Sequence, residues 1–117
     1  MCGGYGYTDS SAEECYKYSS LSDSWQISGT MPNVKALSAH AYLENFGLVM
    51  AGSYTGDSAS VTVTRDGLNF EELAPLPSGN YGGCLAVVNE ETLVYTGGDY
   101  DQYAAYSYDV PSDTWTT

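Results

Sequence analysis

The sequence contains a single histidine, His40, and this limits the catalytic chemistry that the chain can build. Zinc sites need three or four convergent ligands, and neither a CxxC nor an HxxxH spacing is present. A Ser-His-Asp triad could use only His40, and no nucleophile-elbow motif accompanies it. Carboxylates are plentiful, but their spacing singles out no pair for glycoside hydrolysis. We therefore expect no catalytic residue, no metal and no cofactor in this chain.

Tyrosine is the second residue type with a suggestive distribution. Five tyrosines fall in or beside the loops that follow the glycine-rich segments: Tyr5, Tyr7, Tyr54, Tyr100 and Tyr103. A tyrosine in a loop offers a large amphipathic contact area, as binding surfaces often do. Two interpretations stay open: the loops form a binding surface, or these rings serve the ordinary packing of the loops.

The excess of acidic over basic residues disfavours binding to anionic partners. Three basic and 15 acidic residues leave a formal net charge of −12, which repels nucleic-acid phosphates and anionic membranes. We therefore expect neither nucleic-acid nor membrane binding, and no apolar run approaches the roughly 20 residues that span a bilayer. With 43% hydrophobic residues the chain is too apolar to be disordered. The opening residues MCGGYGYTD show neither the basic nor the apolar region of a signal peptide.

One ten-residue pattern occurs three times at a fixed period of 45 residues. The copies are YKYSSLSDSW (16–25), VTVTRDGLNF (61–70) and YSYDVPSDTW (106–115). Laid over each other without a gap, Val61 and Val63 fall on tyrosines, and Phe70 falls on the tryptophans. A fixed period in this range is typical of a repeat architecture.

Each copy contains stretches with the composition of short β-strands. In the complete middle copy they cover about 36–43, 47–52, 59–65 and 70–74, bounded by Gly, Asn, Asp, Ser and Pro. No stretch has a sustained apolar period of 3.6 residues, so we predict an all-β chain with about ten short strands. Four antiparallel strands in a repeat of about 45 residues match the blade of a β-propeller.

Over nearly its whole length the sequence resembles the kelch family of β-propellers. The resemblance rests on double glycines, alternating apolar pairs, an aromatic residue after the turn, and MP or LP turns. The residues that carry it, which we expect to be structural, are Gly3, Gly4, Tyr16, Tyr18, Trp25, Gly52, Val61, Val63, Phe70, Gly97, Gly98, Tyr106, Tyr108 and Trp115. The middle copy departs from the family pattern, since Ser53 replaces the second glycine and Phe70 the tryptophan. The stretch TRDGLNF (64–70) also resembles a shortened Asp-box turn of sialidases, but it occurs once.

The resemblance implies an incomplete ring of blades. Residues 1–32 would form strands two to four of a first blade, and residues 33–77 a complete blade. Residues 78–117 would form strands one to three and the start of strand four of a third blade. Propellers close with roughly four to eight blades, so we expect further blades from a parent chain or from a second copy.

The resemblance to propeller blades also predicts which cysteines lie close together. Cys2 and Cys15 would face each other at the ends of the second and third strands, where the other copies hold small residues. We therefore expect a Cys2–Cys15 disulfide, which would stabilise the fold by about 3 kcal/mol. Such a bond would indicate a secreted, extracellular or lumenal protein. Cys84 lies among apolar residues, and we expect a buried thiol or a partner outside this chain.

What kelch repeats imply by resemblance is scaffolding and protein binding, without a shared reaction. Our first hypothesis is a non-catalytic interaction module whose loops bind a protein partner or a glycan. The alternative is part of a propeller enzyme, galactose-oxidase-like or sugar-acting, whose catalytic residues lie outside this chain. A copper site of the galactose oxidase type needs two histidines, which His40 alone cannot supply.

Overall fold

Ten β-strands in three groups make up the structure, a computed structural model that describes residues 1–4 and 12–117. The N-terminal hairpin contains β1 (Ala12–Ser19) and β2 (Ser24–Lys35). The middle sheet contains β3 (Ala39–Leu43), β4 (Gly47–Ala51), β5 (Val61–Thr64) and β6 (Phe70–Leu73). The C-terminal sheet contains β7 (Cys84–Asn89), β8 (Thr92–Thr96), β9 (Ala105–Asp109) and β10 (Thr114–Thr116). No helix occurs in the described ranges, so the prediction of an all-β protein with about ten short strands is confirmed.

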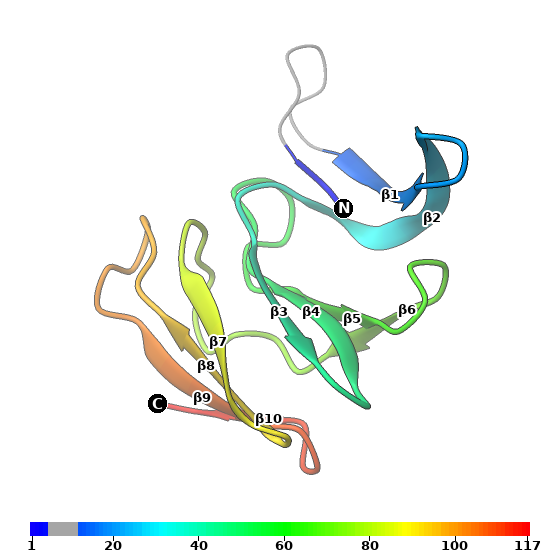
Figure 1. Cartoon of the computed structure of the whole chain (residues 1–117). Helices are drawn as coiled ribbons and strands as arrows, with labels where there is room; N and C mark the ends of the chain where they lie inside the picture. Colours follow the sequence, from blue (N-terminus) through cyan, green and yellow to red (C-terminus); the bar gives the residue numbers. More distant parts are fainter. Residues whose placement is uncertain (5–11) are drawn as a thin grey trace.

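Both four-stranded sheets are antiparallel, and each strand pairs with its neighbours in the sequence (Figure 1). The local sequence explains this arrangement. In β9, buried Tyr106 and Tyr108 alternate with exposed residues, because successive side chains point to opposite faces of a strand. Asn45 in the turn between β3 and β4 has a φ of 69°, a left-handed conformation that asparagine tolerates.

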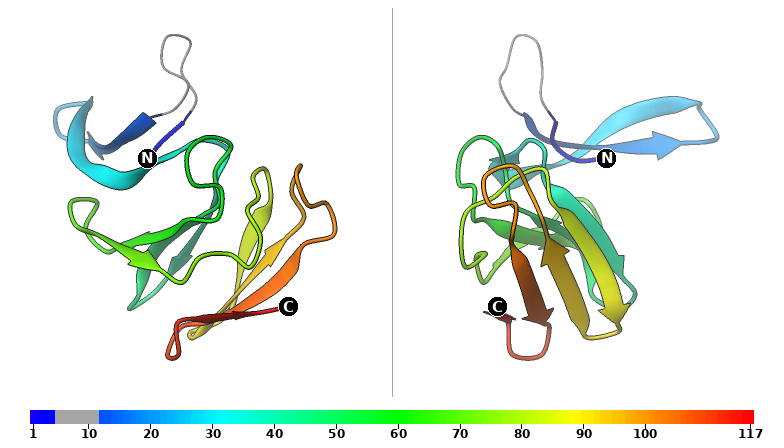
Figure 2. Two further views of the ribbon diagram at one scale, coloured as in Figure 1. Left: turned by 180° about the vertical axis from the view of Figure 1, so that it is seen from behind. Right: turned by 90° about the vertical axis from the view of Figure 1, so that its left-hand side faces the viewer.

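The three groups follow one another as in an arc, with the middle sheet between the hairpin and the C-terminal sheet (Figures 1 and 2). A core of Val49, Val61, Leu93, Tyr95 and other apolar residues joins the middle and C-terminal sheets. A smaller, sulfur-rich core of Cys15, Met31 and Met50 joins the hairpin to the middle sheet. The middle sheet is therefore covered on both faces, and all four residues of β5 are buried.

The strand pairings place the repeated ten-residue pattern in space. In each group a residue of the last strand but one pairs with the aromatic residue of the last strand: Tyr18–Trp25, Thr64–Phe70 and Tyr108–Trp115. Thr62 and Thr64 therefore occupy the positions of the tyrosines, which corrects the gapless overlay of Val61 and Val63 by one residue. The turn before Phe70 is one residue shorter than the turns before the tryptophans, so the two valines face the C-terminal sheet instead.

The predicted disulfide is confirmed, because Cys2 and Cys15 are bonded across an isolated antiparallel bridge. The bond lies against the core between the hairpin and the middle sheet. The expectation of a buried Cys84 is wrong, since this thiol is free and exposed. Cys84 lies on the face of the C-terminal sheet that points away from the middle sheet, and its apolar sequence neighbours gave no sign of this.

Candidate functional site

In the two four-stranded sheets, a glycine-rich segment follows the end of the second strand, β4 or β8. The amide of Gly52 donates a hydrogen bond to the carbonyl of Ser60 at 3.0 Å, and that of Gly97 donates to Ala104 at 2.9 Å. These bonds hold the loop between the second and third strands closed. Gly52 has a φ of 77°, and a Cβ there would stand 2.4 Å from the carbonyl oxygen of Asn80. Glycine is required because the connection between the two sheets passes directly over this backbone.

Asn80 anchors that connection to the next loop. Its side chain is buried and donates to the carbonyls of Gly97 at 2.8 Å and Asp101 at 3.0 Å. Its Oδ1 accepts from the amides of Tyr81 at 2.9 Å and Asp101 at 3.3 Å. The amide group is fully engaged within the protein, so Asn80 shapes the site and leaves ligand contacts to its neighbours.

An uncharged cleft of about 430 Å³ lies beside this connection. Its lining comes from the loop after β4, from the connection between the sheets and from the loop after β8: Tyr54, Gly56, Ser58, Ser78, Gly79, Asn80, Tyr81 and Tyr100. The rings of Tyr54 and Tyr81 pack edge to face with centroids 4.9 Å apart. Aromatic faces beside hydroxyls and backbone groups can stack on a ligand and orient it by hydrogen bonds. We call this the tyrosine cleft.

Of the five loop tyrosines predicted to bind, the structure brings two together in this cleft, Tyr54 and Tyr100. Tyr103 is 93% exposed and does not line the cleft, and its backbone amide donates to the carboxylate of Asp101 at 3.1 Å. Tyr5 and Tyr7 lie outside the described residues. Sequence reasoning missed Tyr81, which stands in the connection between the sheets. A tyrosine within the run SGNYGG was the available signal, since glycines allow close approach of neighbouring loops.

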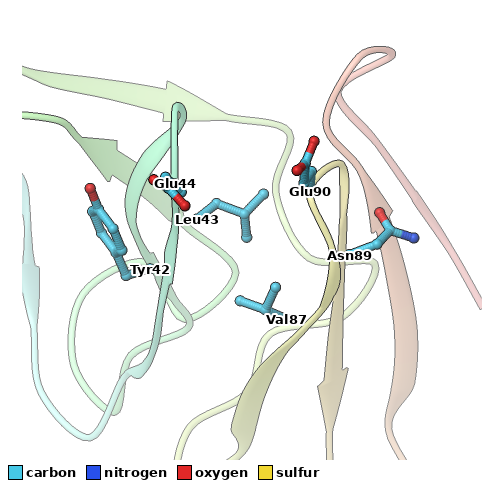
Figure 3. A pocket seen from close by; sticks show the side chains of 6 residues that line it. All are labelled: Tyr42, Leu43, Glu44, Val87, Asn89 and Glu90. Atoms are coloured by element: carbon cyan, nitrogen blue, oxygen red, sulfur yellow. The ribbon is translucent and has the colours of Figure 1, made fainter.

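A second cleft, of about 540 Å³, opens at the opposite end of the same two sheets (Figure 3). It lies between the β3–β4 and β7–β8 turns, and its lining residues are Tyr42, Leu43, Glu44, Val87, Asn89 and Glu90. Figure 3 shows Leu43 and Val87 projecting into the space between the turns, with the carboxylates of Glu44 and Glu90 at its edge. This cleft is anionic, whereas the tyrosine cleft has no charged lining residue.

Two ionisable groups, Lys35 and His40, lie near the junction between the hairpin and the middle sheet. Lys35 is buried and donates from Nζ to the carbonyl of Ser60 at 2.7 Å, and desolvation lowers the pKa of Lys35 to about 8. Desolvation and the charge of Lys35 also lower the pKa of His40. Within residues 1–4 and 12–117, no three His, Cys, Asp or Glu side chains are arranged to hold a metal ion.

The turn that resembles an Asp-box closes on Asp66. Its carboxylate accepts from the backbone amides of Leu68 and Asn69, both at 2.8 Å, and from the side-chain amide of Asn69 at 2.7 Å. These bonds, chiefly those from Asn69, lower the pKa of Asp66 to about 2. Both carboxylate oxygens of Asp66 accept hydrogen bonds from residues of its own turn. Asp66 therefore stabilises the turn between β5 and β6.

Comparison of the sequence with protein-family models and with curated proteins finds no match. Among the described residues, no helix has the length and apolar character needed to cross a membrane.

Proposed function

We propose that this chain is a run of three kelch-type β-propeller blades that acts as a non-catalytic binding module. Three features support the blade assignment: the sheets follow chain order, the glycine-rich loops recur at the same strand end, and successive sheets pack face to face. The hairpin β1–β2 with the Cys2 bridge would be the outer part of a first blade.

The tyrosine cleft is the observation that carries the binding function. Tyr54, Tyr81 and Tyr100 come from three separate segments and border one cavity of about 430 Å³. Tyrosine supplies contact area at low conformational cost, which is why it is enriched in binding surfaces. An uncharged, hydroxyl-rich cleft suits a peptide segment of a protein partner, or a glycan, better than an anionic ligand. The net charge of −12 further disfavours anionic partners.

The disulfide supports a site of action in an oxidising compartment. Bonds of this kind persist in secreted and lumenal proteins and are rare in the cytosol. Cys2–Cys15 ties β1 to the N-terminal segment, so reduction would loosen that part of the fold. We accordingly propose an extracellular or lumenal protein.

A binding screen with paired variants tests the proposed function. The purified chain is probed with a glycan array and with a displayed random peptide library, and each binder is measured against Tyr54→Ala/Tyr100→Ala. Binders should weaken at least about tenfold in this variant, since aromatic contacts dominate such surfaces. Tyr42→Ala is the matched control, because Tyr42 is exposed and lies at the anionic cleft. Binders that ignore the double variant but are lost with Tyr42→Ala, or two empty screens, would contradict the proposal.

A further inference from the structure

Two faces of the molecule lack a covering sheet within the described residues. The first is the face of the hairpin that carries Tyr16, Tyr18, Trp25 and Ile27. Trp25 is 58% and Ile27 59% exposed, although both are large and apolar. The second is the face of the C-terminal sheet that points away from the middle sheet. Both faces can be compared with the interface that already joins the middle and C-terminal sheets.

That existing interface packs large side chains onto small ones. The middle sheet contributes two cross-strand rows of small residues, Ala39–Ala51–Val61 and Ala41–Val49–Val63. The C-terminal sheet contributes large residues, among them Tyr95, Tyr106 and Tyr108, and these rings bury the small rows. At its edge the indole Nε1 of Trp115 donates to the carbonyl of Ala74 at 2.8 Å.

The C-terminal sheet has a second set of such rows of small residues, which we call the small half of the interface. Its outward face presents rows at the same pairing positions, Cys84–Thr96–Ala105 and Ala86–Val94–Ser107. In the middle sheet the counterparts of Thr96 and Ala105 are Ala51 and Val61, which are at most 1% exposed. On the C-terminal sheet both residues are exposed, so this surface has the composition of an interface without its cover.

The hairpin has a second set of large aromatic residues like those of the C-terminal sheet, which we call the large half of the interface. Tyr18 pairs with Trp25 as Tyr108 pairs with Trp115, and the rings meet at similar centroid distances of 5.3 Å and 4.9 Å. Tyr18 is 45% exposed, whereas Tyr108 is fully buried against the middle sheet. The hairpin therefore presents the same aromatic pair that closes the existing interface, but with nothing to bury it among the described residues.

We infer that a second copy of this chain docks head to tail on these faces, with the hairpin of one copy covering the outward face of its partner's C-terminal sheet. Each chain carries both unmatched halves, and large residues again meet small ones. The contact continues the sheet-on-sheet stacking seen inside the chain. Such a heterologous contact closes into a ring if the rotation allows it. The inference rests on strand pairing and burial and is independent of the proposed binding function.

Sedimentation velocity of the whole chain over a range of concentrations tests this inference. Two copies with a charge of −12 each repel, so association should strengthen as salt is raised. Trp25→Ala removes the large half, and Ala105→Glu places a charge on the small half. Each variant should weaken association at least about tenfold. Leu21→Ala is the matched control, because Leu21 is fully exposed in the hairpin turn, outside the paired face, and should leave association unchanged.

Mixing the two variants separates head-to-tail docking from other contacts. Trp25→Ala keeps an intact small face and Ala105→Glu an intact hairpin, so an equimolar mixture should form a one-to-one complex. A wild-type chain that stays monomeric at every concentration would overturn the inference. So would association that survives Ala105→Glu, since hairpin would then meet hairpin. A dimer that persists as a covalent species on non-reducing denaturing gels would be an intermolecular disulfide through the exposed Cys84 and would equally refute it.

Discussion

The N-terminal hairpin and the C-terminal sheet contain the same local structure in different surroundings. The hydroxyl of Tyr18 donates to Asp23 at 2.5 Å, and that of Tyr108 donates to Asp113 at 2.7 Å. Asp23 and Asp113 share a left-handed φ of 48° and 50°. Yet Asp113 also accepts from the amide of Ala74 at 2.9 Å, a bond to the neighbouring sheet. The turn geometry is therefore local, whereas burial comes from the neighbour.

The two regions are also stabilised by different means. In the C-terminal sheet, the aromatic rings pack into the larger core and Trp115 bonds to the middle sheet. The hairpin has a smaller core and a covalent bond, Cys2–Cys15. A unit covered on one face by a small core gains most from a cross-link that restricts its unfolded state. Four pairs of variants test this contrast.

Removal of the disulfide should have the largest effect, and mainly on the hairpin. Cys2→Ser/Cys15→Ser should lower the free energy of unfolding by about 3 kcal/mol, because the cross-link joins residues 13 apart in sequence and removes the entropy of that loop from the unfolded chain. Hydrogen exchange should quicken in β1 and β2 and stay slow in β8 and β9. Cys84→Ser is the control and should change stability by less than about 0.5 kcal/mol, because this thiol is exposed. Uniform loss of protection across all strands would contradict a local role.

Tryptophan substitutions should separate the two copies of the aromatic pair. Trp115→Ala should destabilise by about 2 to 3 kcal/mol, because it removes ring packing and the bond to Ala74. Trp25→Ala should cost less than about 1 kcal/mol at protein concentrations where the chain is monomeric, since its ring is mostly exposed. Urea unfolding followed by circular dichroism measures both. Equal losses would show that burial does not distinguish the copies.

A pH dependence should mark the junction between the hairpin and the middle sheet. Lys35 has a pKa of about 8 when folded, against 10.5 for an unperturbed lysine. Between these values the unfolded chain holds a proton that the native state has released. Stability should therefore rise with pH across this window, by an amount on the order of 2 kcal/mol. Urea titrations at pH 8 and pH 9.5, below the ordinary pKa of tyrosine, measure most of the rise.

A second lysine of the hairpin serves as the control for the pH-dependent rise in stability. Lys35→Met should abolish this rise, whereas Lys17→Met, at an exposed lysine of the same hairpin, should retain it. An undiminished rise in Lys35→Met would assign the effect to other groups. The corresponding junction with the C-terminal sheet uses the uncharged Asn80, so it adds no such dependence.

The smallest effect should come from the tyrosine hydroxyls. Tyr108→Phe should destabilise by about 1 kcal/mol, because the buried hydroxyl loses its bond to Asp113. Tyr18→Phe removes the equivalent bond at an exposed position and should change stability by less than about 0.5 kcal/mol. Thermal unfolding of the two variants side by side measures the difference. A larger loss from Tyr18→Phe would reverse the proposed order.

Much of this fold could be read from local patterns. Period-two alternation marked β9, and the expected middle strands agree with β3 to β6 within a few residues. The joint appearance of Cys2 and Cys15 at facing positions predicted their bond. The glycine-rich loops located Tyr54 and Tyr100 near one another. The missed residue, Tyr81, enters the cleft through a connection whose path depends on two sheets at once.

The amino-acid sequence by itself determined the strands, the turns and the covalent pairing, because these depend on residues close together or on one cross-strand register. Only the tertiary structure decided the register of Thr62 and Thr64, which depends on the length of one turn against its partner strand. It also decided which face of each unit is buried. Tyr18 and Tyr108 hold equivalent positions in the repeated pattern, but within the described residues only Tyr108 meets another sheet. Burial is a property of what packs against a strand, and a local pattern does not contain that information.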